Sequence, residues 1–527
     1  MTQITSLACR VSTLRLPYLH SDNTETINFS LKQTENVGLI GYNGSGKSLL
    51  MQCLAQKQRP LSGSVHWERP FYSIEQHCRL VGETVAEALG LANLFCALER
   101  VNAGNGSLAD IELIGERWDF PVQWQQLTEQ AGLTLAPTTQ VATLSGGEQT
   151  RLALCAAFIR KHDYLLLDEP SNHLDRAGRR WLIEALKAHQ GGALVVSHDV
   201  DLLNTLDTLF ELSNQGLQRY GGNYQHYQQQ KQQEQAAIVR RLEQVQRAMD
   251  EEKHQQQRAN EKAAKRRKQG EKQRKQGSQC HLILDRRRDS AQQSQRTRNQ
   301  QHSQRLDQQQ KTQQYYQSLQ ETDYQQTLSF AGIAGRGGMK LSLQDVKLPF
   351  GTEQKISLTL RHGERLRIDG DNGSGKSTLL RCIAGELQPD AGEIFVSGQC
   401  VYLDQTFTQR ATDITALNYL QQALPHLTQT ELRTGLGALN LKGDESMLPM
   451  SALSGGERLK VALFAIARRA QPVDILLLDE PENHLDLPSR ELLSHVIASF
   501  QGALLIVSHD DHFMENMGLH EHYYLSK

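Results

Sequence analysis

The sequence has no apolar run long enough to cross a membrane. Its longest apolar stretches, Tyr164–Leu167 and Ile475–Leu478, have the length of a strand, whereas a membrane-spanning helix needs roughly 18 or more apolar residues. The first ten residues also lack the charged segment and apolar core of a secretory leader. We therefore expect a cytoplasmic protein that does not enter the membrane.

Paired cysteines are also missing. The eight cysteines are scattered and form no Cys-x-x-Cys pair. This excludes zinc and iron–sulfur sites of the usual spacing and argues against a disulfide framework. Reduced thiols in the cytosol are the expected state.

Net charge is nearly absent overall, but charge is unevenly distributed along the chain. The formal charge of the 527 residues is −2, yet residues 231–311 hold 21 Lys and Arg against 10 Asp and Glu. This stretch therefore carries +11 and the remainder −13. It is also rich in Gln and poor in apolar residues. A basic middle between two acidic flanks suggests a polyanionic partner for the middle.

A glycine-rich loop lies between a strand expected at Val37–Ile40 and a helix expected at Leu49–Ala55. Its sequence, GYNGSGKS, fits the phosphate-loop pattern in the strand–loop–helix setting that this pattern requires. Backbone N–H groups and the start of the helix attract phosphate oxygens. Lys47 is expected to reach the β- and γ-phosphates, and Ser48 to bind Mg²⁺. The other expected ATP-binding residues of this loop are Gly41, Asn43, Gly44, Ser45 and Gly46.

Two carboxylates and a histidine follow the next expected strands. Asp168 and Glu169 end the apolar strand that begins at Tyr164, and His198 follows the strand Ala193–Val196. Strands buried on both faces are central and parallel, so these side chains should meet at one sheet edge. Asp168 is the expected Mg²⁺ ligand and Glu169 the general base for an attacking water. His198 is a candidate phosphate sensor, although a single His is more often structural.

The whole series returns in the second half of the chain. Lys47 and Lys376 are 329 residues apart, whereas Asp168 and Asp479 are 311 apart. The first copy therefore holds 18 more residues than the second between Lys47 and Asp168, a span that includes its Leu-Ser-Gly-Gly-Glu segment, a helix start that is also suited to anions. The two copies of this segment are Ser145, Gly146, Gly147 and Glu148, and Ser454, Gly455, Gly456 and Glu457. The second phosphate loop supplies Gly370, Asn372, Gly373, Ser374, Gly375, Lys376, Ser377 and Thr378. Glu480 and His509 repeat Glu169 and His198.

This double series resembles two ATP-binding cassettes, each with a Walker A loop, a Q-loop glutamine, a signature, a Walker B strand and a switch histidine. Tandem cassettes without a membrane segment, the SNHLD and ENHLD segments after Walker B, and a charged linker resemble the ABC-F family. The entry to the linker, Tyr220–Tyr224, is similar to that family's pattern. The implied fold is α/β, with two P-loop cassettes joined by a long α-helical hairpin. The expected domains are residues 1–222, 223–330 and 331–527, with a short arm-like insert within about 91–124.

The resemblance implies two composite ATP sites in a monomer whose cassettes face each other head to tail. Site 1 would pair the loop 41–48 and its followers with the signature at 454–457, and site 2 the loop 370–377 with the signature at 145–148. The implied ligands are ATP and Mg²⁺, with Mg²⁺ held by Ser48, Gln76, Asp168, Ser377, Gln405 and Asp479. Leu49 departs from the family pattern, since the second copy has Thr378 there. Phe350 is better placed than Tyr18 to stack on adenine.

The linker predicts an antiparallel helical hairpin with a cationic tip. Ile238, Leu242, Val245 and Met249 fall on one helical stripe, and a break is expected at Gly277–Leu284. The cations near the break are expected to bind RNA phosphates with little base readout. They are Lys262, Lys265, Arg266, Arg267, Lys268, Lys272, Arg274, Lys275, Arg286, Arg287 and Arg288. A solvated, partly disordered Gln-rich spacer is the alternative.

By resemblance, the expected function is an ATPase that binds the ribosome when closed on ATP, directs its linker toward the tRNA exit site and P-site tRNA, and leaves after hydrolysis. An antibiotic-resistance factor that protects the ribosome is the alternative. An exporter subunit would need separate transmembrane partners, which we do not expect. DNA-maintenance ATPases would need zinc-binding Cys pairs or a long coiled coil inside each cassette, and the sequence has neither.

Overall fold

The computed structural model describes two compact units. Residues 1–225 and 324–527 form the first unit, which holds both cassettes, and residues 226–323 form the second. The described residues are 6–17, 26–76, 80–172, 174–213, 216–275, 281–319, 337–404, 414–439, 441, 446–483, 485–519 and 521–526. None of the helices in these ranges is long and apolar enough to cross a membrane.

The first cassette is built on a six-stranded sheet in the order β5-β6-β7-β3-β8-β9. Its strands are β3 (Asn36–Ile40), β5 (Phe71–Ile74), β6 (Tyr164–Asp168), β7 (Ala193–Val196), β8 (Thr208–Ser213) and β9 (Gly216–Gly221). All pairs are parallel except β8 with β9. Every residue of β6 and β7 is buried, which explains why these strands read as unbroken apolar runs.

A smaller antiparallel sheet covers the same core in the order β2-β1-β4. Its strands are β1 (Leu7–Arg15), β2 (Ile27–Lys32) and β4 (Ser62–Trp67). Leu14 and Leu31 from this sheet join Leu50 of α1 (Lys47–Leu54) and Leu39 of β3 in one buried cluster. The phosphate loop thus connects β3 and α1, and both elements are anchored in the core. The two ends of the loop are therefore fixed in position.

The second cassette repeats this plan. Its parallel sheet has the order β14-β15-β16-β12-β17, and its antiparallel sheet the order β11-β10-β13. The strands are β10 (Met339–Lys347), β11 (Ile356–Arg361), β12 (Arg365–Gly370), β13 (Ala391–Val396), β14 (Cys400–Leu403), β15 (Ile475–Asp479), β16 (Ala503–Val507) and β17 (His522–Leu525). Helix α11 (Lys376–Ile383) follows the second phosphate loop. The expected two-cassette α/β fold is confirmed.

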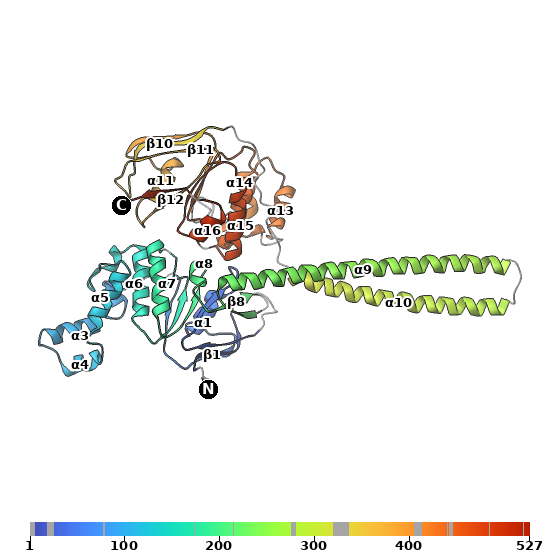
Figure 1. Ribbon diagram of the computed structural model, residues 1–527, viewed down its shortest axis with the longest axis horizontal. Coiled ribbons are helices and arrows are strands. Elements are labelled where there is room, and N and C mark those ends of the chain that lie inside the picture. Colours follow the sequence, from blue (N-terminus) through green and yellow to red (C-terminus); the bar gives the residue numbers. More distant parts are fainter. Residues whose placement is uncertain are drawn as a thin grey trace. The chain divides into compact units, whose positions relative to one another are not determined.

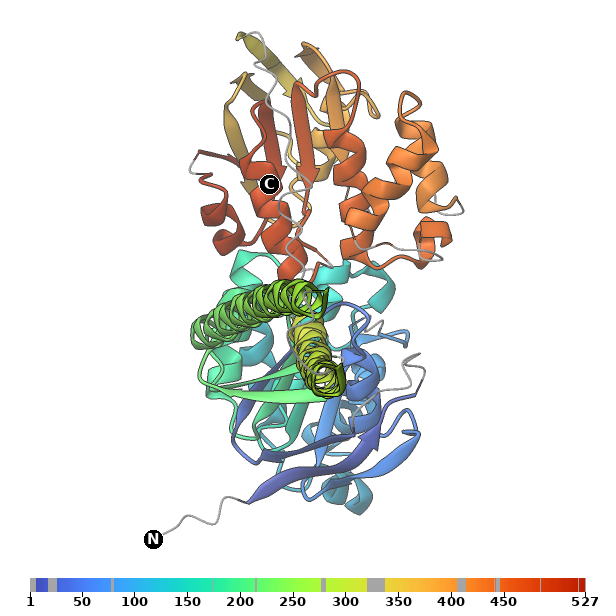
Figure 2. The same cartoon turned by 90° about the vertical axis from the view of Figure 1, so that its right-hand side faces the viewer.

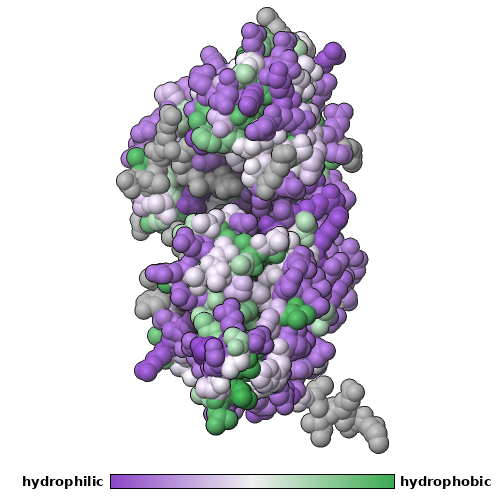
Figure 3. Space-filling model, turned by 90° about the vertical axis from the view of Figure 1, so that its left-hand side faces the viewer, coloured by the Kyte–Doolittle hydropathy of each residue, from purple (hydrophilic) through white to green (hydrophobic). Residues whose placement is uncertain are grey.

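Helices fill the remaining parts of the cassettes (Figure 1). In the first they are α2 (Val85–Ala88), α3 (Ala92–Asn102), α4 (Leu108–Ile114), α5 (Phe120–Gln130), α6 (Gly146–Phe158), α7 (Arg176–Ala188) and α8 (Val200–Leu203). In the second they are α12 (Ala416–Ala423), α13 (Gln429–Ala438), α14 (Gly455–Ala467), α15 (Leu487–Ala498) and α16 (Asp511–Asn516). One face of the molecule is mostly hydrophilic, with small scattered apolar patches (Figure 3).

Helices α3 and α4 lie in the segment where the sequence places the arm-like insert. The Arg100 guanidinium pairs with the Asp110 carboxylate, and Asp110 also closes a capping box with Ser107 at the start of α4. Phe95 packs edge-to-face on Phe120 at 5.5 Å between ring centroids. Helices α3 and α4 therefore form a small helical pair with its own contacts.

The second unit is a hairpin of two long helices, α9 (Tyr224–Lys275) and α10 (His281–Leu319), which lie side by side (Figures 1 and 2). Val245 and Met249 of the expected stripe are buried. Two polar pairs cross between the helices: Glu252 Oε1 lies 2.5 Å from His302 Nδ1, and Gln313 Nε2 donates to Gln246 Oε1 at 2.9 Å. The antiparallel hairpin is confirmed, but α10 already begins at His281, so Leu282–Leu284 belong to a helix rather than to the expected break.

Candidate functional site

The parallel sheet brings the expected motifs of the first cassette to one edge. Strand β3 pairs with β7, and β7 pairs with β6, all in the same direction. Their carboxyl ends therefore lie together. The phosphate loop follows β3, Asp168 ends β6, and His198 lies two residues beyond β7. In the second cassette β12, β15 and β16 arrange the equivalent residues in the same way.

The two phosphate loops share the same local geometry. Gly46 and Gly375 cap their helices with φ of 96° and 97°, a left-handed conformation that favours glycine. Lys47 Nζ donates to the carbonyl oxygens of Gly41 at 2.7 Å and Tyr42 at 3.0 Å, and Lys376 repeats both bonds within its own loop. Burial lowers the pKa of both lysines, although nearby carboxylates oppose the shift. Each loop thus holds a buried ammonium whose natural partner is an anion.

The two candidate bases are held in a strained backbone conformation. Glu169 has φ of 50° and Glu480 φ of 44°, a region that costs a non-glycine residue free energy. Each backbone N–H is fixed to the neighbouring strand, Glu169 to Val196 O and Glu480 to Val507 O, both at 2.9 Å. Because the same strain occurs in both copies, we infer that the direction of the carboxylate outweighs the free-energy cost of the backbone conformation.

Burial raises the pKa of both bases to about 7. For Glu169 the neighbouring Asp168 adds to the shift, and for Glu480 the neighbouring Glu482 and Asp479 do. The switch histidines are affected in the opposite sense, because burial lowers the pKa of His198, and that of His509 to about 3. His198 Nε2 lies 3.4 Å from Glu169 Oε1, and His509 Nε2 lies 3.7 Å from Glu480 Oε1. An imidazole whose pKa is lowered therefore lies beside each base.

Residues of both cassettes line one cavity of about 400 Å³ at site 1. From the first cassette come Asn43, Gly44, Gly46, Lys47, Ser48, Leu49, Gln76, Asp168, Glu169, Asn172, Val196 and His198, and from the second Ser454, Gly455 and Arg490. The structure therefore brings the first phosphate loop together with the second signature, as the resemblance implies for site 1. Of these residues, sequence reasoning did not single out Asn172, Val196 and Arg490.

The signature helices are capped by their own motif residues. Ser145 caps α6 and Ser454 caps α14, each in a reciprocal capping box with the glutamate three residues on, Glu148 or Glu457. The glutamates accept bonds from the serine N–H and hydroxyl at 2.7 to 2.8 Å. Glu148 and Glu457 thus act on their own helix starts, which leaves the N–H groups of the glycines for an anion.

A further contact joins the first phosphate loop to the second cassette. The backbone N–H of Asn43 donates to Asp486 Oδ2 at 2.9 Å, while Asp486 Oδ1 accepts from Ser489 N–H at 3.1 Å and so caps α15. A second contact between the cassettes is the ion pair of Arg176 on α7 with Asp511 at 2.7 Å. The ENHLD segment is therefore part of site 1, although it lies 439 residues beyond Lys47.

Site 2 differs from site 1 in its buried polar groups. Tyr402 Oη donates to Asp479 Oδ2 at 3.1 Å, where the first cassette has Ser73 at the matching position of β5. Glu482 is fully buried and accepts bonds from Ser508 Oγ at 2.5 Å and His509 N–H at 3.2 Å. Its counterpart is Ser171, whose Oγ lies 3.4 Å from Ser197 Oγ. Site 2 thus holds one more carboxylate beside the segment 508–510 around its switch histidine. This segment, and 197–199 in the first cassette, are called the switch loops.

Some expected positions lie outside the described residues or side chains. Gln405 and Tyr18 are not among the described residues, nor are the histidines of the two NHLD segments, His173 and His484. In the hairpin, Lys262, Lys265, Arg266, Lys268 and Lys272 are exposed on α9. The side chains that lie outside the described part are those of Arg267, Arg274, Lys275, Arg286, Arg287 and Arg288.

Gly351 offers a test of how the second phosphate loop is held. Its φ is 107°, and a Cβ there would lie 2.5 Å from Gly375 Cα. Gly351→Ala should therefore push the loop out of place and weaken ATP binding at site 2 about 10-fold or more, since strain of this kind costs roughly 1–3 kcal/mol. Titration with ATP should show one tight site instead of two.

The matched control for this variant is Gly437→Ala, because a Cβ at Gly437 of α13 meets no atom within 4 Å. That variant should keep both sites and fold at least as stably as the parent chain. Two tight sites in Gly351→Ala would show that the contact with Gly375 does not shape the loop.

Comparison with known proteins agrees with this geometry. The family model described as ABC transporter matches residues 24–172 and 354–483. The probable ATP-binding protein YheS of Haemophilus influenzae is 30% identical, with 96% of this chain and 77% of that protein covered. The ribosome protection protein VmlR of Bacillus subtilis is 28% identical over 93% of this chain and 81% of its own. ABC transporter F family member 5 of Arabidopsis thaliana is 28% identical, with 97% and 74% covered.

Among solved structures, the RNase-L inhibitor shares the fold, with a TM-score of 0.50 at 18% identity and with 96% of this chain and 86% of that chain covered. The paired cassettes and their composite cavity define an ATP-binding-cassette ATPase. Within that class, the chain belongs to the ABC-F family as a tandem ATP-binding protein.

Proposed function

We propose that this ATPase binds the ribosome when its cassettes are closed on ATP, and dissociates after hydrolysis, thereby modulating translation in the cytoplasm. The basic hairpin carries this proposal. Five cations of α9, from Lys262 to Lys272, are exposed within eleven residues of one helix. A structured RNA recognised by its phosphates and shape is the polyanion that such a surface suits.

The hairpin is long enough to act at a distance. Helix α9 has 52 residues, which corresponds to roughly 78 Å at about 1.5 Å per residue. Its buried stripe and cross-helix pairs lie in the part near Val245 to Glu252, whereas the exposed cations lie beyond. In our proposal the stiff part supports the cationic end, which is directed toward the tRNA exit site and the P-site tRNA.

At each ATP site the residues divide the chemistry between them. Lys47 and the N–H groups of its loop bind the β- and γ-phosphates, while Ser454 and Gly455 contact the γ-phosphate from the other cassette. Glu169 takes a proton from the attacking water onto its carboxylate, and a pKa raised to about 7 suits a general base near neutral pH. His198 lies beside Glu169 and contacts the γ-phosphate, so that it responds to its presence. Lys376, Glu480, His509 and the signature Ser145–Glu148 take these roles at site 2.

The donors at these sites also fit Mg²⁺, which prefers oxygen ligands and uses few carboxylates. Within the described residues, Asp479 Oδ1 is buried without a hydrogen-bond partner, and so are the hydroxyls of Ser45 and Ser374. Asp168 with Ser48, and Asp479 with Ser377, would hold the ion, and Gln76 and Gln405 would complete the two sites. When bound, Mg²⁺ would neutralise charge on the phosphates.

The physical logic of the cycle is a population shift. ATP contacts both cassettes at once, so it stabilises the closed arrangement relative to any open one, and loss of the γ-phosphate removes those differential contacts. A monomer with an intramolecular pair of cassettes needs no transmembrane subunit for this switch.

Protection of the ribosome against an antibiotic is the second candidate. It is favoured by the likeness to a protein named for ribosome protection. The ATP cycle would be the same, and the difference would lie in the action of the hairpin tip. Growth with and without ribosome-targeting antibiotics, in cells lacking or overproducing the protein, would separate the two functions.

The direct test is co-sedimentation of the protein with ribosomes. The variant Glu169→Gln with Glu480→Gln should pellet with ribosomes in ATP but not in ADP. Changing Lys262, Lys265, Arg266, Lys268 and Lys272 to Gln in that background should abolish most of the pelleting. ATP-trapped protein that stays in the supernatant would overturn the proposal.

The matched control removes five other exposed cations from the same helix, namely Arg240, Arg241, Arg247, Lys253 and Arg258. Both variants lose five charges, so a general loss of attraction would affect them equally. We expect the control to pellet nearly as well as the parent, because its charges lie in the supporting part of the hairpin. Equal losses would reduce the role of the hairpin to nonspecific attraction.

A further inference from the structure

We propose that Arg490 acts in trans at ATP site 1, and that Arg490 and its counterpart Arg179 couple the switch loop of each cassette to hydrolysis in the other. This inference rests on the proposed ATP sites and deepens them, but it does not depend on the ribosome. Neither arginine belongs to a motif of the phosphate loop, signature or Walker B strand.

The first observation is the position of Arg490. It lies on α15, four residues and about one helical turn after Asp486, whose carboxylate accepts from Asn43 of the first phosphate loop. The face of α15 that carries Asp486 thus also carries Arg490 toward the first cassette. Arg490 lines the cavity that holds Lys47, Glu169 and His198, and its side chain is only 11% exposed. A nearly buried cation in an ATP cavity faces the phosphates or the base.

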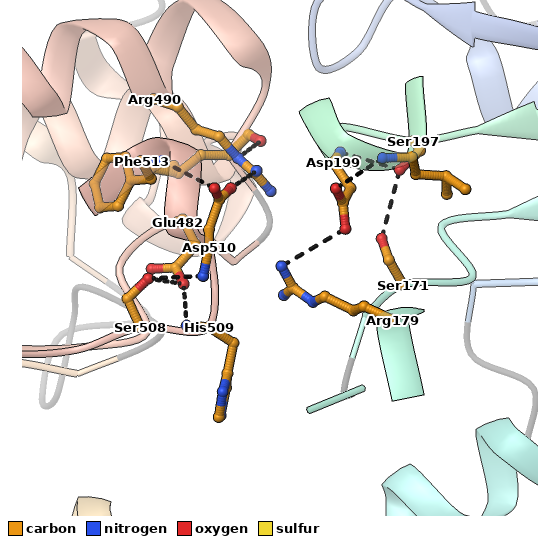
Figure 4. A network of polar contacts seen from close by, with 12 residues as sticks. Ser171, Arg179, Ser197, Asp199, Glu482, Arg490, Ser508, His509, Asp510 and Phe513 are labelled. Carbon is orange, nitrogen blue, oxygen red and sulfur yellow. Dashed lines mark hydrogen bonds and ion pairs between the residues drawn. The ribbon is translucent and has the colours of Figure 1, made fainter. Parts of the chain in front are cut away.

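The second observation is what holds Arg490 in place. Its Nη1 donates to Asp510 Oδ2 at 2.9 Å, and its Nε donates to Leu485 O at 3.2 Å. Asp510 directly follows the switch histidine His509 and caps α16 by accepting from Phe513 N–H at 2.9 Å. Figure 4 shows Arg490 reaching Asp510 from its own cassette. The guanidinium is therefore fixed to the switch loop of site 2 while it lines site 1.

The third observation is that the arrangement occurs twice. Arg179 lies 311 residues before Arg490, the offset that also relates His198 to His509. Arg179 Nη1 lies 3.6 Å from Asp199 Oδ2 (Figure 4). Its Nε donates to Leu174 O at 3.3 Å. Asp199 follows His198 and caps α8. The same two partners, namely a loop carbonyl and the aspartate that follows the switch histidine, recur around each arginine.

Electrostatics agree with a trans position for both groups. Burial by itself lowers the pKa of Arg179, but Asp199, Asp510, Glu482 and Glu480 together raise it, and three of these carboxylates belong to the other cassette. Arg490 in turn lowers the pKa of Glu169, against the larger effect of burial, and contributes to the lowered pKa of His198. Each arginine thus stabilises the ionised base of the opposite site.

The consequence is a reciprocal connection. When the γ-phosphate leaves site 2, its switch loop loses a partner, and Asp510 can release or shift Arg490 at site 1. The same holds for Asp199 and Arg179 in the other direction. Coupling free energies between two sites are reciprocal by thermodynamic necessity, and two equivalent ion pairs provide such a connection in both directions.

The test measures phosphate release in a single turnover, with protein in excess over ATP and without ribosomes. In the Glu480→Gln background only site 1 has its base, and in the Glu169→Gln background only site 2. Arg490→Gln should slow the first background about 10-fold or more, since the loss of a charge-stabilising donor has effects of this order, and the second less than about 3-fold. Arg179→Gln should show the reverse preference.

Two further variants complete the design. Asp510→Asn should slow site 1 as well, although Asp510 does not belong to the first cassette, and Arg490→Lys should restore part of the rate if the positive charge is what acts. The control is Arg180→Gln, an exposed neighbour of Arg179 on α7, which should change neither background. Thermal melting identifies variants that fail to fold.

Equal slowing of both backgrounds by Arg490→Gln, or stronger slowing of site 2, would overturn the trans assignment and leave Arg490 as a structural partner of Asp510. Absence of an effect of Asp510→Asn on site 1 would overturn the coupling. Because no ribosome is present, either failure leaves the ribosome proposal intact. Failure of that proposal would likewise leave these rates unchanged.

Discussion

Replacing Glu169 and Glu480 together by glutamine should lower ATP turnover by about 10²- to 10⁴-fold, the usual contribution of a general base, while ATP binding persists. Glutamine has nearly the same shape as glutamate, but its amide cannot accept a proton from water. The backbone bonds to Val196 and Val507 that hold the two residues do not involve the side chains. Steady-state phosphate release and equilibrium ATP binding, measured on the same preparation, check both halves of the prediction.

The control for this pair is Glu184→Gln with Glu393→Gln, two exposed carboxylates on α7 and β13. It removes the same charge from the chain and should leave turnover within about 2-fold, as surface substitutions usually do. If the Glu169 and Glu480 variant kept more than a tenth of the parent rate, another group would have to receive the proton. His198 and His509, which lie near the carboxylates, would then be the groups to examine.

The sequence predicted the parts of the site that depend on one strand and the loop after it. The glycines and Lys47 define a phosphate loop because the backbone N–H groups of such a loop bind phosphate oxygens. The apolar run before Asp168 can only be a central strand. The edge where these residues meet follows from parallel pairing. Neither the strained φ of Glu169 nor its burial could be foreseen, because both depend on residues distant in the sequence, such as Val196 in the adjacent strand.

Residues that act across cassettes were missed for a physical reason. Arg490 stands on a helix whose exposed and buried faces depend on what packs against α15, and the first cassette supplies that surface. The repeat offset of 311 residues was the available signal, since it pairs Arg490 with Arg179. In the hairpin, the sequence predicts a break that includes the apolar run Leu282–Leu284, but three consecutive apolar residues also suit a helix, and α10 includes them.

The two copies are alike in the groups to which we assign the chemistry and differ in the groups around them. Leu49 replaces the hydroxyl that Thr378 provides, and Glu482 replaces the Ser171 hydroxyl. Glu482 fixes the switch loop of site 2 through Ser508 and His509, and with burial it raises the pKa of Glu480. Equivalent motifs in unequal surroundings favour two sites that hydrolyse ATP at different rates, which the single-base backgrounds described above would measure separately.

The salt dependence of ribosome binding should reveal how many hairpin cations contact phosphates. Each phosphate neutralised contributes about 0.7 to 0.9 to the slope of log affinity against log salt. Replacing Lys262, Lys265, Arg266, Lys268 and Lys272 by Gln should therefore reduce the slope by about 3.5 to 4.5 if all five bind phosphate. For a surface that keeps all five contacts, affinity should fall about 100- to 500-fold between roughly 50 and 200 mM salt from these contacts alone.

The slope distinguishes a binding surface from a solvated spacer more sharply than affinity does. A Gln-rich spacer would leave the slope unchanged on substitution, because no counterions are released where no phosphate is met. The five supporting cations from Arg240 to Arg258 serve again as the control, and their loss should change the slope by less than about 1. Equal changes in slope for both sets of cations would mean that the electrostatic field of the whole helix attracts RNA. A change in slope confined to the set from Lys262 to Lys272 would mean that this end of the hairpin contacts the RNA.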